Sequence, residues 1–274
     1  MKLEALEVLR CPACGGSLKA ASAPRINELR DGELGCAGCK RTWSVVDGIP
    51  RLVFPEQLEN GDVRALRLWN RVAPVYSWIF GLTNLIRGVR GGEERRTLIS
   101  RLNLKPGSTV LELAAGSGYN LQIIAQQTGD QAGVFGLDLS PRMLGLAARR
   151  LRPLSHPPVL VLGNSAHLPF SDDSFEVVLD GFGSKYYTDN GRAIREMLRV
   201  ARPGGRIVIA ELGVPRDERR TLRQRLLLLW IPGFGEPPPL EAIPVDVEGL
   251  KLEWDRHRTA YAIEFQKPNP DAKP

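Results

Sequence analysis

The chain has 274 residues, of which 43% are hydrophobic, 25% charged and 7% aromatic. This composition is typical of a globular protein with one large domain, or one large and one small domain. It excludes a disordered chain, a collagen-like repeat and a small disulfide scaffold. The longest uninterrupted apolar run covers 226–231, far short of the roughly 20 residues that a membrane-spanning helix needs. Glu4 and Glu7 interrupt any apolar core of a secretory signal at the N-terminus, so we expect a cytoplasmic protein.

The net charge of +6 comes from one segment of the chain. Residues 61–110 contain nine basic and three acidic side chains, whereas the segments 1–60, 111–215 and 216–274 are each balanced. The basic residues are Arg64, Arg67, Arg71, Arg87, Arg90, Arg95, Arg96, Arg101 and Lys105. They predict a local basic surface, which is either a solvated helix face or a surface for an anionic or membrane-associated partner.

All four cysteines lie near the N-terminus, in two CxxC pairs. Cys11 and Cys14 form the first pair, and Cys36 and Cys39 form the second after a gap of 21 residues. Two such pairs predict a zinc ribbon, in which four thiolates fill a tetrahedral metal site. A site closed by four thiolates is structural rather than catalytic. The alternative of two disulfides is disfavoured because nothing in the sequence indicates an oxidising compartment.

The sequence around these cysteines resembles a known module. The runs LRCPACGGSL and CAGCKRTWSVVDGIPRLV are similar to the short zinc-ribbon domain related to the small activator subunit of tRNA and protein methyltransferases. That resemblance covers about residues 7–54 and implies a module that precedes or partners a methyltransferase domain. We therefore expect a zinc-ribbon domain over 1–58, which is also a candidate surface for a protein partner.

The rest of the chain predicts an α/β domain. Helical spacing of apolar residues indicates helices over 62–103, with a break at Gly81, in a helical entry segment at 59–108. Apolar runs at 109–113, 134–137, 159–162, 175–179 and 206–211 then alternate with helical patterns, one of which begins at Ser140 and Pro141 and ends near Leu151. Alternation of this kind predicts a doubly wound, mostly parallel sheet. Two further strands at 250–254 and 260–265 complete a seven-stranded Rossmann-like sheet with an antiparallel C-terminal strand, in a domain over 109–270.

The first of these strands leads into a glycine turn that is suited to a nucleotide. Gly116 and Gly118 let the backbone approach a ligand closely, but Leu121 stands where a dinucleotide motif needs a third glycine. A nucleotide without a pyrophosphate needs less room there, which favours S-adenosylmethionine over NAD. The second strand ends at Asp138, an acid that is placed to accept hydrogen bonds from both ribose hydroxyls.

These features combine with the segments GNSAHLPFSDDSF and RPGGR into a pattern that resembles class I S-adenosylmethionine-dependent methyltransferases over roughly residues 64–267. The resemblance implies that the glycines face the methionine part, Asp138 the ribose, Leu139 and Met143 the adenine face, and Ser165 and Ala166 the adenine edge. Asn164 stands where many relatives have Asp, so it would offer a neutral oxygen to the adenine amino group. The full candidate set for this cofactor is Glu112, Ala114, Gly116, Gly118, Asn120, Asp138, Leu139, Met143, Asn164, Ser165, Ala166 and Asp180.

The loop DGFGSKYYTD, the run REMLRVARPGGRIVIAELGVP and the segment WNRVAPVYSWIFG resemble the ubiquinone and menaquinone C-methyltransferase family. The chain departs from that family at Ser77, where an Asp is usual, and in its N-terminal ribbon. Methyl transfer by direct displacement needs alignment and exclusion of water rather than a covalent nucleophile, which agrees with the lack of a catalytic triad motif. Tyr76, Lys185 and Tyr186 are the acceptor-side candidates for an aromatic, quinone-like or lipid molecule, although the tyrosines also suit packing against the cofactor.

Two other functions remain open from the sequence. One is methylation of an rRNA or tRNA base, since a bacterial large-subunit rRNA guanine methyltransferase also joins a four-cysteine zinc site to this fold. The absence of basic excess in the ribbon disfavours nucleic acid. The other is a non-catalytic protein whose ribbon binds a partner. Finally, five arginines between 216 and 225 precede the apolar run 226–231, which predicts a helix that either rests on an anionic membrane or packs in the core, and we favour the core.

Overall fold

The computed structural model describes residues 1–21, 28–129, 133–216, 219–231 and 233–271. Its strands are β1 (Leu18–Ala20), β2 (Gly32–Cys36), β3 (Thr42–Val46), β4 (Ile49–Leu52), β5 (Val110–Leu113), β6 (Val134–Asp138), β7 (Val159–Gly163), β8 (Phe175–Gly181), β9 (Ala201–Leu212), β10 (Glu248–Trp254) and β11 (Ala260–Gln266). Its helices are α1 (Asn60–Val72), α2 (Tyr76–Arg87), α3 (Gly91–Ser100), α4 (Tyr119–Thr128), α5 (Pro141–Leu151), α6 (Asn190–Val200) and α7 (Leu222–Trp230). Short 3₁₀ turns are η1 (Leu3–Glu7), η2 (Ala73–Val75), η3 (Ser184–Tyr186) and η4 (Leu240–Ala242).

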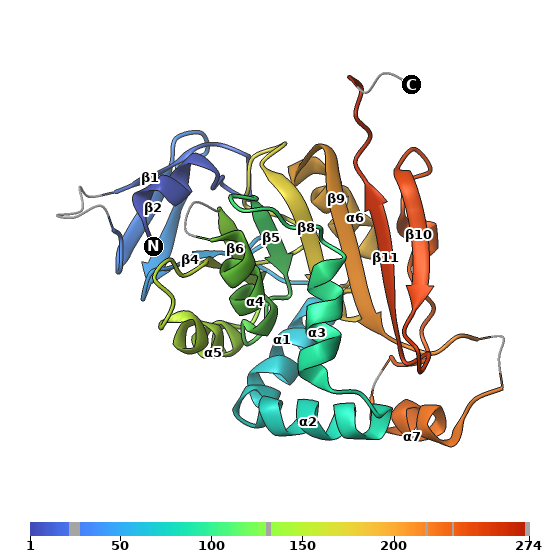
Figure 1. Ribbon diagram of the computed structural model, residues 1–274. Helices are drawn as coiled ribbons and strands as arrows, with labels where there is room; N and C mark the ends of the chain where they lie inside the picture. The colour runs from blue at the N-terminus through green and yellow to red at the C-terminus, as the bar shows by residue number, and fades with distance from the viewer. Residues whose placement is uncertain (22–27, 130–132, 217–218, 232, 272–274) are drawn as a thin grey trace.

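The predicted α/β class is confirmed. Strands β7, β6, β5, β8 and β9 are neighbours in that order and all parallel. The antiparallel strand β11 follows β9, and β10 lies at the far edge (Figure 1). The strand order reverses between β5 and β8, and ligands of such sheets bind beyond the carboxyl ends of the strands at that point.

The seven predicted strands are present as β5 to β11, and the N-terminal strands, which the sequence places in a separate ribbon, extend the same sheet to eleven strands among the described residues. β1 to β4 form an antiparallel meander, and β4 pairs in parallel with β7 through Leu52 opposite Gly163. The physical reason is that β7 would otherwise be an open edge with unpaired backbone groups. Leu9, Leu34 and Trp43 of the N-terminal region belong to the same buried cluster as Phe170, so the ribbon shares a core with the sheet.

Helices cover both faces of the sheet, as the alternating pattern predicts. Residues of α3, α4 and α5, among them Ile99, Ile124 and Leu144, bury one face, and Ile194 and Met197 of α6 bury the other. α5 begins as predicted, because the Ser140 hydroxyl accepts a hydrogen bond from the Met143 backbone N–H at 3.1 Å. This cap fixes the start of a helix directly after β6.

The entry segment is helical as predicted, but its break is not at Gly81. Gly81 lies within α2, and the chain instead turns at η2, which contains Pro74. Proline lacks the N–H that a continuous helix needs. α2 ends at Gly88, whose φ of 72° is the left-handed conformation of a helix C-cap.

The predicted basic surface contains fewer side chains than the sequence suggests, because some of its arginines are buried or paired with acids. Arg87 and Arg95 are buried. Arg87 donates hydrogen bonds to Thr259 (3.1 Å) and Asp255 (3.2 Å) and pairs with Glu94. Arg101 is half-buried and pairs with carboxylates of β10 and β11. The exposed members are Arg64, Arg67, Arg71, Arg90, Arg96 and Lys105.

The interpretation of 226–231 as a core helix is wrong for half of the run, since Leu227, Leu228 and Ile231 pack in one small core and the other three residues are exposed. Leu227 is buried, but Leu226, Leu229 and Trp230 are exposed. A run of apolar letters alone does not say which side chains a partner element covers. Within the described ranges, no helix combines the length and the apolarity that crossing a bilayer requires.

Candidate functional site

A cleft lies beyond the carboxyl ends of β5 to β8, where the strand order reverses. The turn after β5 needs its glycines, because Gly116 and Gly118 have φ values of 54° and 75°. A Cβ on Gly118 would lie 3.0 Å from the Cβ of Ala147, so this glycine lets α4 and α5 approach each other. Gly116 lines the cleft beside Met143.

Asp138 lines the cleft at the end of β6 and braces the glycine turn. Its Oδ2 accepts the Gly116 N–H at 2.8 Å, and its Oδ1 accepts the Ser140 N–H at 2.7 Å. Burial raises the pKa of Asp138 to about 6, against the effect of these hydrogen bonds. A carboxylate has about four acceptor positions, so both oxygens keep capacity for ribose hydroxyls.

Asn164 follows β7 and has an unexpected partner. Its Oδ1 accepts the Ala166 N–H at 3.0 Å, and its Nδ2 donates to Asp62 Oδ2 at 2.9 Å. Asp62 is buried in the first turn of α1, accepts the Thr188 hydroxyl at 2.6 Å and lines the same cleft. Sequence reasoning missed Asp62, because it is 102 positions away from Asn164 in the chain.

Seven of the predicted cofactor residues line this cleft: Ala114, Gly116, Asp138, Leu139, Met143, Asn164 and Ser165. The other five, Glu112, Gly118, Asn120, Ala166 and Asp180, are not among its lining residues.

Three of these five, Glu112, Asn120 and Asp180, lie behind the cleft and form hydrogen bonds that fix its surroundings. Asn120 donates to Glu112 at 2.6 Å and accepts from Arg95 at 2.6 Å. Burial raises the pKa of Glu112 to about 8. Asp180 accepts the Gly183 N–H at 3.0 Å, which shapes the loop after β8. Arg95, missed as a site residue, connects α3 to this group, since its Nη2 lies 3.5 Å from the Tyr76 hydroxyl.

A second cavity of about 290 Å³ adjoins the cleft. The cleft itself has a volume of about 110 Å³. The two spaces share the side chains of Trp69, Tyr76, Phe182 and Tyr186. The second cavity lies between α1, α2, η3 and the end of α7, and the structure brings all three acceptor-side candidates, Tyr76, Lys185 and Tyr186, to its wall.

This second cavity is mostly apolar and contains one ion pair. Among the described residues that line it, only Lys185 and Glu211 are charged. Their Nζ and Oε1 atoms are 3.0 Å apart, and the side chains are 5% and 2% exposed. Burial raises the pKa values of Tyr76 and Tyr186, so both phenols remain protonated donors near neutral pH. Sequence reasoning missed Glu211, whose position inside a strand pattern gives no local signal.

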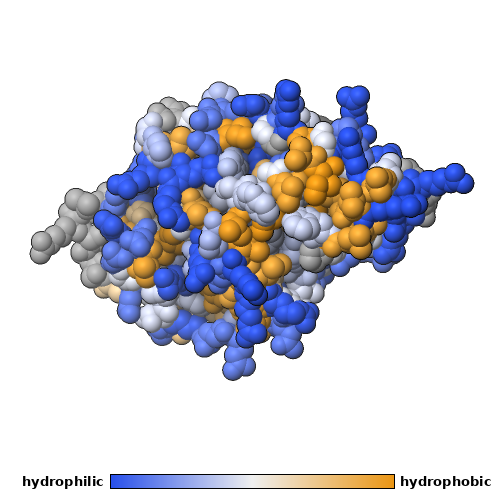
Figure 2. All heavy atoms as spheres, turned by 90° about the horizontal axis from the view of Figure 1, so that it is seen from below, coloured by the Kyte–Doolittle hydropathy of each residue, from blue (hydrophilic) through white to orange (hydrophobic). Residues whose placement is uncertain are grey.

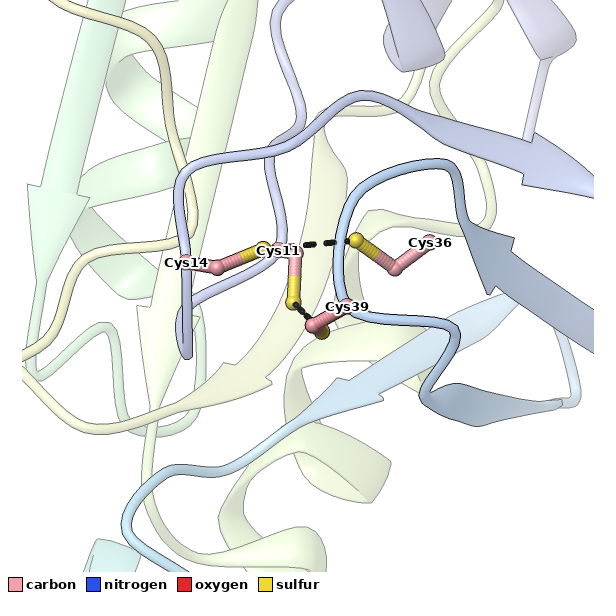
Figure 3. A group of neighbouring side chains, drawn as sticks. All are labelled: Cys11, Cys14, Cys36 and Cys39. Atoms are coloured by element: carbon pink, nitrogen blue, oxygen red, sulfur yellow. Dashed lines mark hydrogen bonds between the residues drawn. The ribbon is translucent and has the colours of Figure 1, made fainter.

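The four cysteines lie together at the tip of the ribbon (Figure 3). Their Sγ atoms are all within 4.8 Å of one another, with Cys14 and Cys36 at 3.5 Å and Cys11 and Cys39 at 3.7 Å. These separations exclude disulfides as placed. A tetrahedral zinc with Zn–S bonds of about 2.3 Å separates its sulfurs by about 3.8 Å, so the group fits a zinc ion.

Small residues complete the two cysteine turns. Gly15 has a φ of 72°, and a Cβ on Gly16 would lie 3.0 Å from the Cys36 sulfur. Gly16 therefore leaves room for the thiolates.

Parallel strand order, a glycine turn and a strand-end acid define a nucleotide-binding α/β site, and comparison with known proteins identifies it as the site of a class I S-adenosylmethionine-dependent methyltransferase. Residues 92–226 match the model of the ubiE/COQ5 methyltransferase family, and residues 2–48 match the Trm112p-like protein model. The chain is 35% identical over 171 residues to a demethylmenaquinone methyltransferase of Lactobacillus johnsonii, covering 62% of this chain and 69% of that one. It belongs to the ubiE/COQ5 methyltransferase family and is an enzyme that uses S-adenosylmethionine.

Other relatives match a shorter part. A ubiquinone/menaquinone biosynthesis C-methyltransferase of Legionella pneumophila is 36% identical over 123 residues, which is 44% of this chain and 49% of that protein. Among solved structures, phosphoethanolamine N-methyltransferase 2 of Haemonchus contortus has a TM-score of 0.56 at 16% identity, over 80% of this chain and 62% of that one. A chain from the complex of the Haloferax volcanii Trm112 activator with a methyltransferase has a TM-score of 0.51 at 20% identity, over 70% and 97%. These two structures show the fold alone.

Proposed function

We propose that this enzyme methylates a ring carbon of a hydroquinone-like acceptor that has an apolar tail. The observation that supports this most is the apolar cavity beside the cofactor cleft, with the buried Lys185–Glu211 pair as its charged wall. If the polar ring of the acceptor lies at that pair, the apolar tail of the acceptor contacts side chains such as Ile79 and Phe80. The curated relatives named above are quinone methyltransferases, which agrees with this acceptor class.

Glu211 is suited to take a proton from the acceptor. Its Oε1 accepts the Leu212 N–H at 2.7 Å in addition to Lys185. Its Oε2 has only long contacts, to the Ser184 hydroxyl at 3.5 Å and the Lys185 N–H at 3.4 Å. Removal of a ring hydroxyl proton makes the neighbouring ring carbon nucleophilic, and Lys185 compensates the negative charge.

S-adenosylmethionine supplies a methyl group on a positively charged sulfur. The methyl group would pass from the sulfur to the ring carbon, which leaves a neutral thioether. The ring carbon's proton would then go to water while Glu211 returns its proton to the ring oxygen, so that one proton is released in total. The protein's part is to align the two molecules and exclude water. The neutral phenols of Tyr76 and Tyr186, which line both spaces, donate to the acceptor oxygens in this proposal.

The cofactor is held by residues of the cleft in the same proposal. Asp138 accepts the ribose hydroxyls, and Leu139 and Met143 pack against the adenine. Asn164 has no carboxylate to accept the adenine amino group. Asp62 supplies one instead, because its side chain is hydrogen bonded to that of Asn164 in the cleft wall.

We further propose that 1–58 is a structural zinc domain, 59–108 a helical lid and 109–270 the cofactor domain. The pairing of β4 with β7 gives the ribbon a supporting role within its own chain. A protein partner of the ribbon would then use another surface than the β4 edge.

Turnover with labelled S-adenosylmethionine tests the function. We expect label in an organic-extractable product when a short-chain demethylated hydroquinone is offered, and none in total RNA. Glu211→Gln should lower kcat by about 100-fold with unchanged cofactor affinity by calorimetry, whereas Glu241→Gln, which alters an exposed carboxylate of η4, should act as wild type. Label in RNA would replace this proposal with the RNA alternative. Silence with both acceptors despite cofactor binding would refute the hydroquinone.

A further inference from the structure

Exposed apolar side chains gather on one side of the protein. Of the eleven large hydrophobic residues that are exposed in the described ranges, eight lie on α1, η2, α2 and α7. They are Leu68, Val75, Trp78, Leu85, Leu222, Leu226, Leu229 and Trp230, and we call them the α2–α7 apolar surface. α2 and α7 contact each other, and Figure 2 shows apolar side chains clustered on the face that these helices present, among hydrophilic ones. Clusters of this kind mark interaction sites.

The helix α2 is apolar on two sides. Ile79 and Phe80 point to the acceptor cavity, while Trp78 and Leu85 are 67% and 76% exposed. A small core of Leu227 with Ile86 and neighbours anchors α7 to α2 from within. A helix that only separates a core from water has a polar outer face, so the outer face of α2 requires another environment.

Among the described residues, the exposed charges on α7 and just before it are positive, whereas Glu236, after α7, is an exposed acid. Neither α2 nor α7 contains an acidic residue. Exposed arginines stand on α7 and just before it, at Arg216, Arg219, Arg220, Arg223 and Arg225. The two acids of that stretch, at positions 217 and 218, lie outside the described residues. Arg223 lies against Gly88 at the end of α2. Apolar side chains bordered by arginines complement an anionic lipid surface.

The same surface adjoins the acceptor cavity. Leu68 and Trp230 line the cavity and are also exposed members of the α2–α7 apolar surface. An acceptor with an apolar tail would therefore reach the Lys185–Glu211 pair without leaving apolar surroundings.

We propose that the α2–α7 apolar surface docks on an anionic bilayer, from which the acceptor enters the cavity. This inference rests on the proposed function for the identity of the acceptor. A second copy of the chain fits the surface less well, because a twofold contact would bring the arginines of both copies together.

Vesicle sedimentation of the full chain tests the docking. We expect binding to phosphatidylcholine vesicles that contain phosphatidylglycerol, weaker binding to phosphatidylcholine alone, and a decline as salt rises. Leu229→Glu should lower binding to the anionic vesicles by about tenfold. Leu250→Glu is the matched control, since Leu250 is an exposed leucine on β10, and it should bind as wild type.

Several results would overturn the docking: no binding to anionic vesicles, equal binding by the wild type and Leu229→Glu, or a concentration-dependent dimer that Leu229→Glu abolishes. Turnover of a water-soluble short-chain hydroquinone separates the two proposals. Both variants should turn it over as wild type does, and a specific loss in Leu229→Glu would place Leu229 in the reaction rather than at a membrane. Vesicle binding without any hydroquinone turnover would refute the acceptor and leave the docking in place.

Discussion

Replacing Asp138 by Asn tests the centre of the cofactor site, and the pH dependence of the wild type tests it without any mutation. The carboxylate has a pKa of about 6 in the ligand-free protein because it is buried. Only the ionised form has all its oxygen lone pairs free to accept the ribose hydroxyls and the two backbone N–H groups. Affinity for S-adenosylmethionine should therefore fall as the pH drops through 6, and not as it rises.

The magnitude follows from the pKa. With a value of about 6, roughly one tenth of the protein is ionised at pH 5, so the Kd should be about tenfold higher at pH 5 than at pH 7. Hydrogen bonds to a charged group contribute about 1.5–3 kcal/mol each, so Asp138→Asn should weaken binding at pH 7 by about tenfold or more. The Asn amide also turns an NH₂ group toward Gly116 or Ser140, since both are donors to the present carboxylate.

Isothermal titration calorimetry between pH 5 and 7 measures these changes. The range stops at 7 because Glu112, with a pKa of about 8, titrates above it. Asp246→Asn, which changes an exposed carboxylate, is the matched control and should show the wild-type pH profile. A wild-type Kd that is constant from pH 5 to 7, or an Asp138→Asn variant that binds as wild type at pH 7, would refute the role assigned to this carboxylate.

Three further changes separate the other parts of the site. Asp62→Ala should raise the Kd for S-adenosylmethionine by about tenfold but not for an analogue that lacks the adenine amino group, and calorimetry showing equal losses for both ligands would contradict the contact. Cys36→Ser should lower both the zinc content measured by elemental analysis and the Tm, with Ser44→Ala, at an exposed position of β3, as control, and an unchanged zinc content would refute the site. Lys185→Met leaves Glu211 buried without its cation, which should lower the free energy of unfolding by about 3 kcal/mol. Adding Glu211→Leu removes the unpaired charge, so the double variant should regain stability in denaturant but not turnover. If the second substitution restores no stability, the pair is not buried as described.

The sequence predicts best what depends on neighbours along the chain. The cap at Ser140, the glycine turn and the alternation of strands and helices each depend on a few adjacent residues, and the structure confirms them. The cysteine pairs are equally local, because each CxxC turn is short. Their meeting in space follows from the chemistry of a four-thiolate site.

Contacts between distant segments were beyond such reasoning. Arg87 and Arg95 counted as surface charge in the sequence, but each has acceptors from other elements that allow its burial. Asp62 looks like an ordinary acid in a helical first turn. The exposure of Leu229 depends on what covers α7, and an apolar run has the same letters in a core and at a surface.

Three separate segments meet at the loop after β7, and this meeting gives the ribbon a physical connection to the cofactor. β4 fixes the end of β7 by pairing at Gly163, one residue before Asn164. Asp62 of α1 binds the Asn164 side chain, and Thr188, which precedes α6, binds Asp62 in turn. A change in the zinc ribbon would thus alter the position of Asn164 through β4, and a movement of α1 would alter it through Asp62. Since α1 also lines the acceptor cavity through Trp69, the helix proposed to contact the acceptor is held by the same loop that is proposed to contact the cofactor, and we expect the binding of one molecule to alter the affinity for the other.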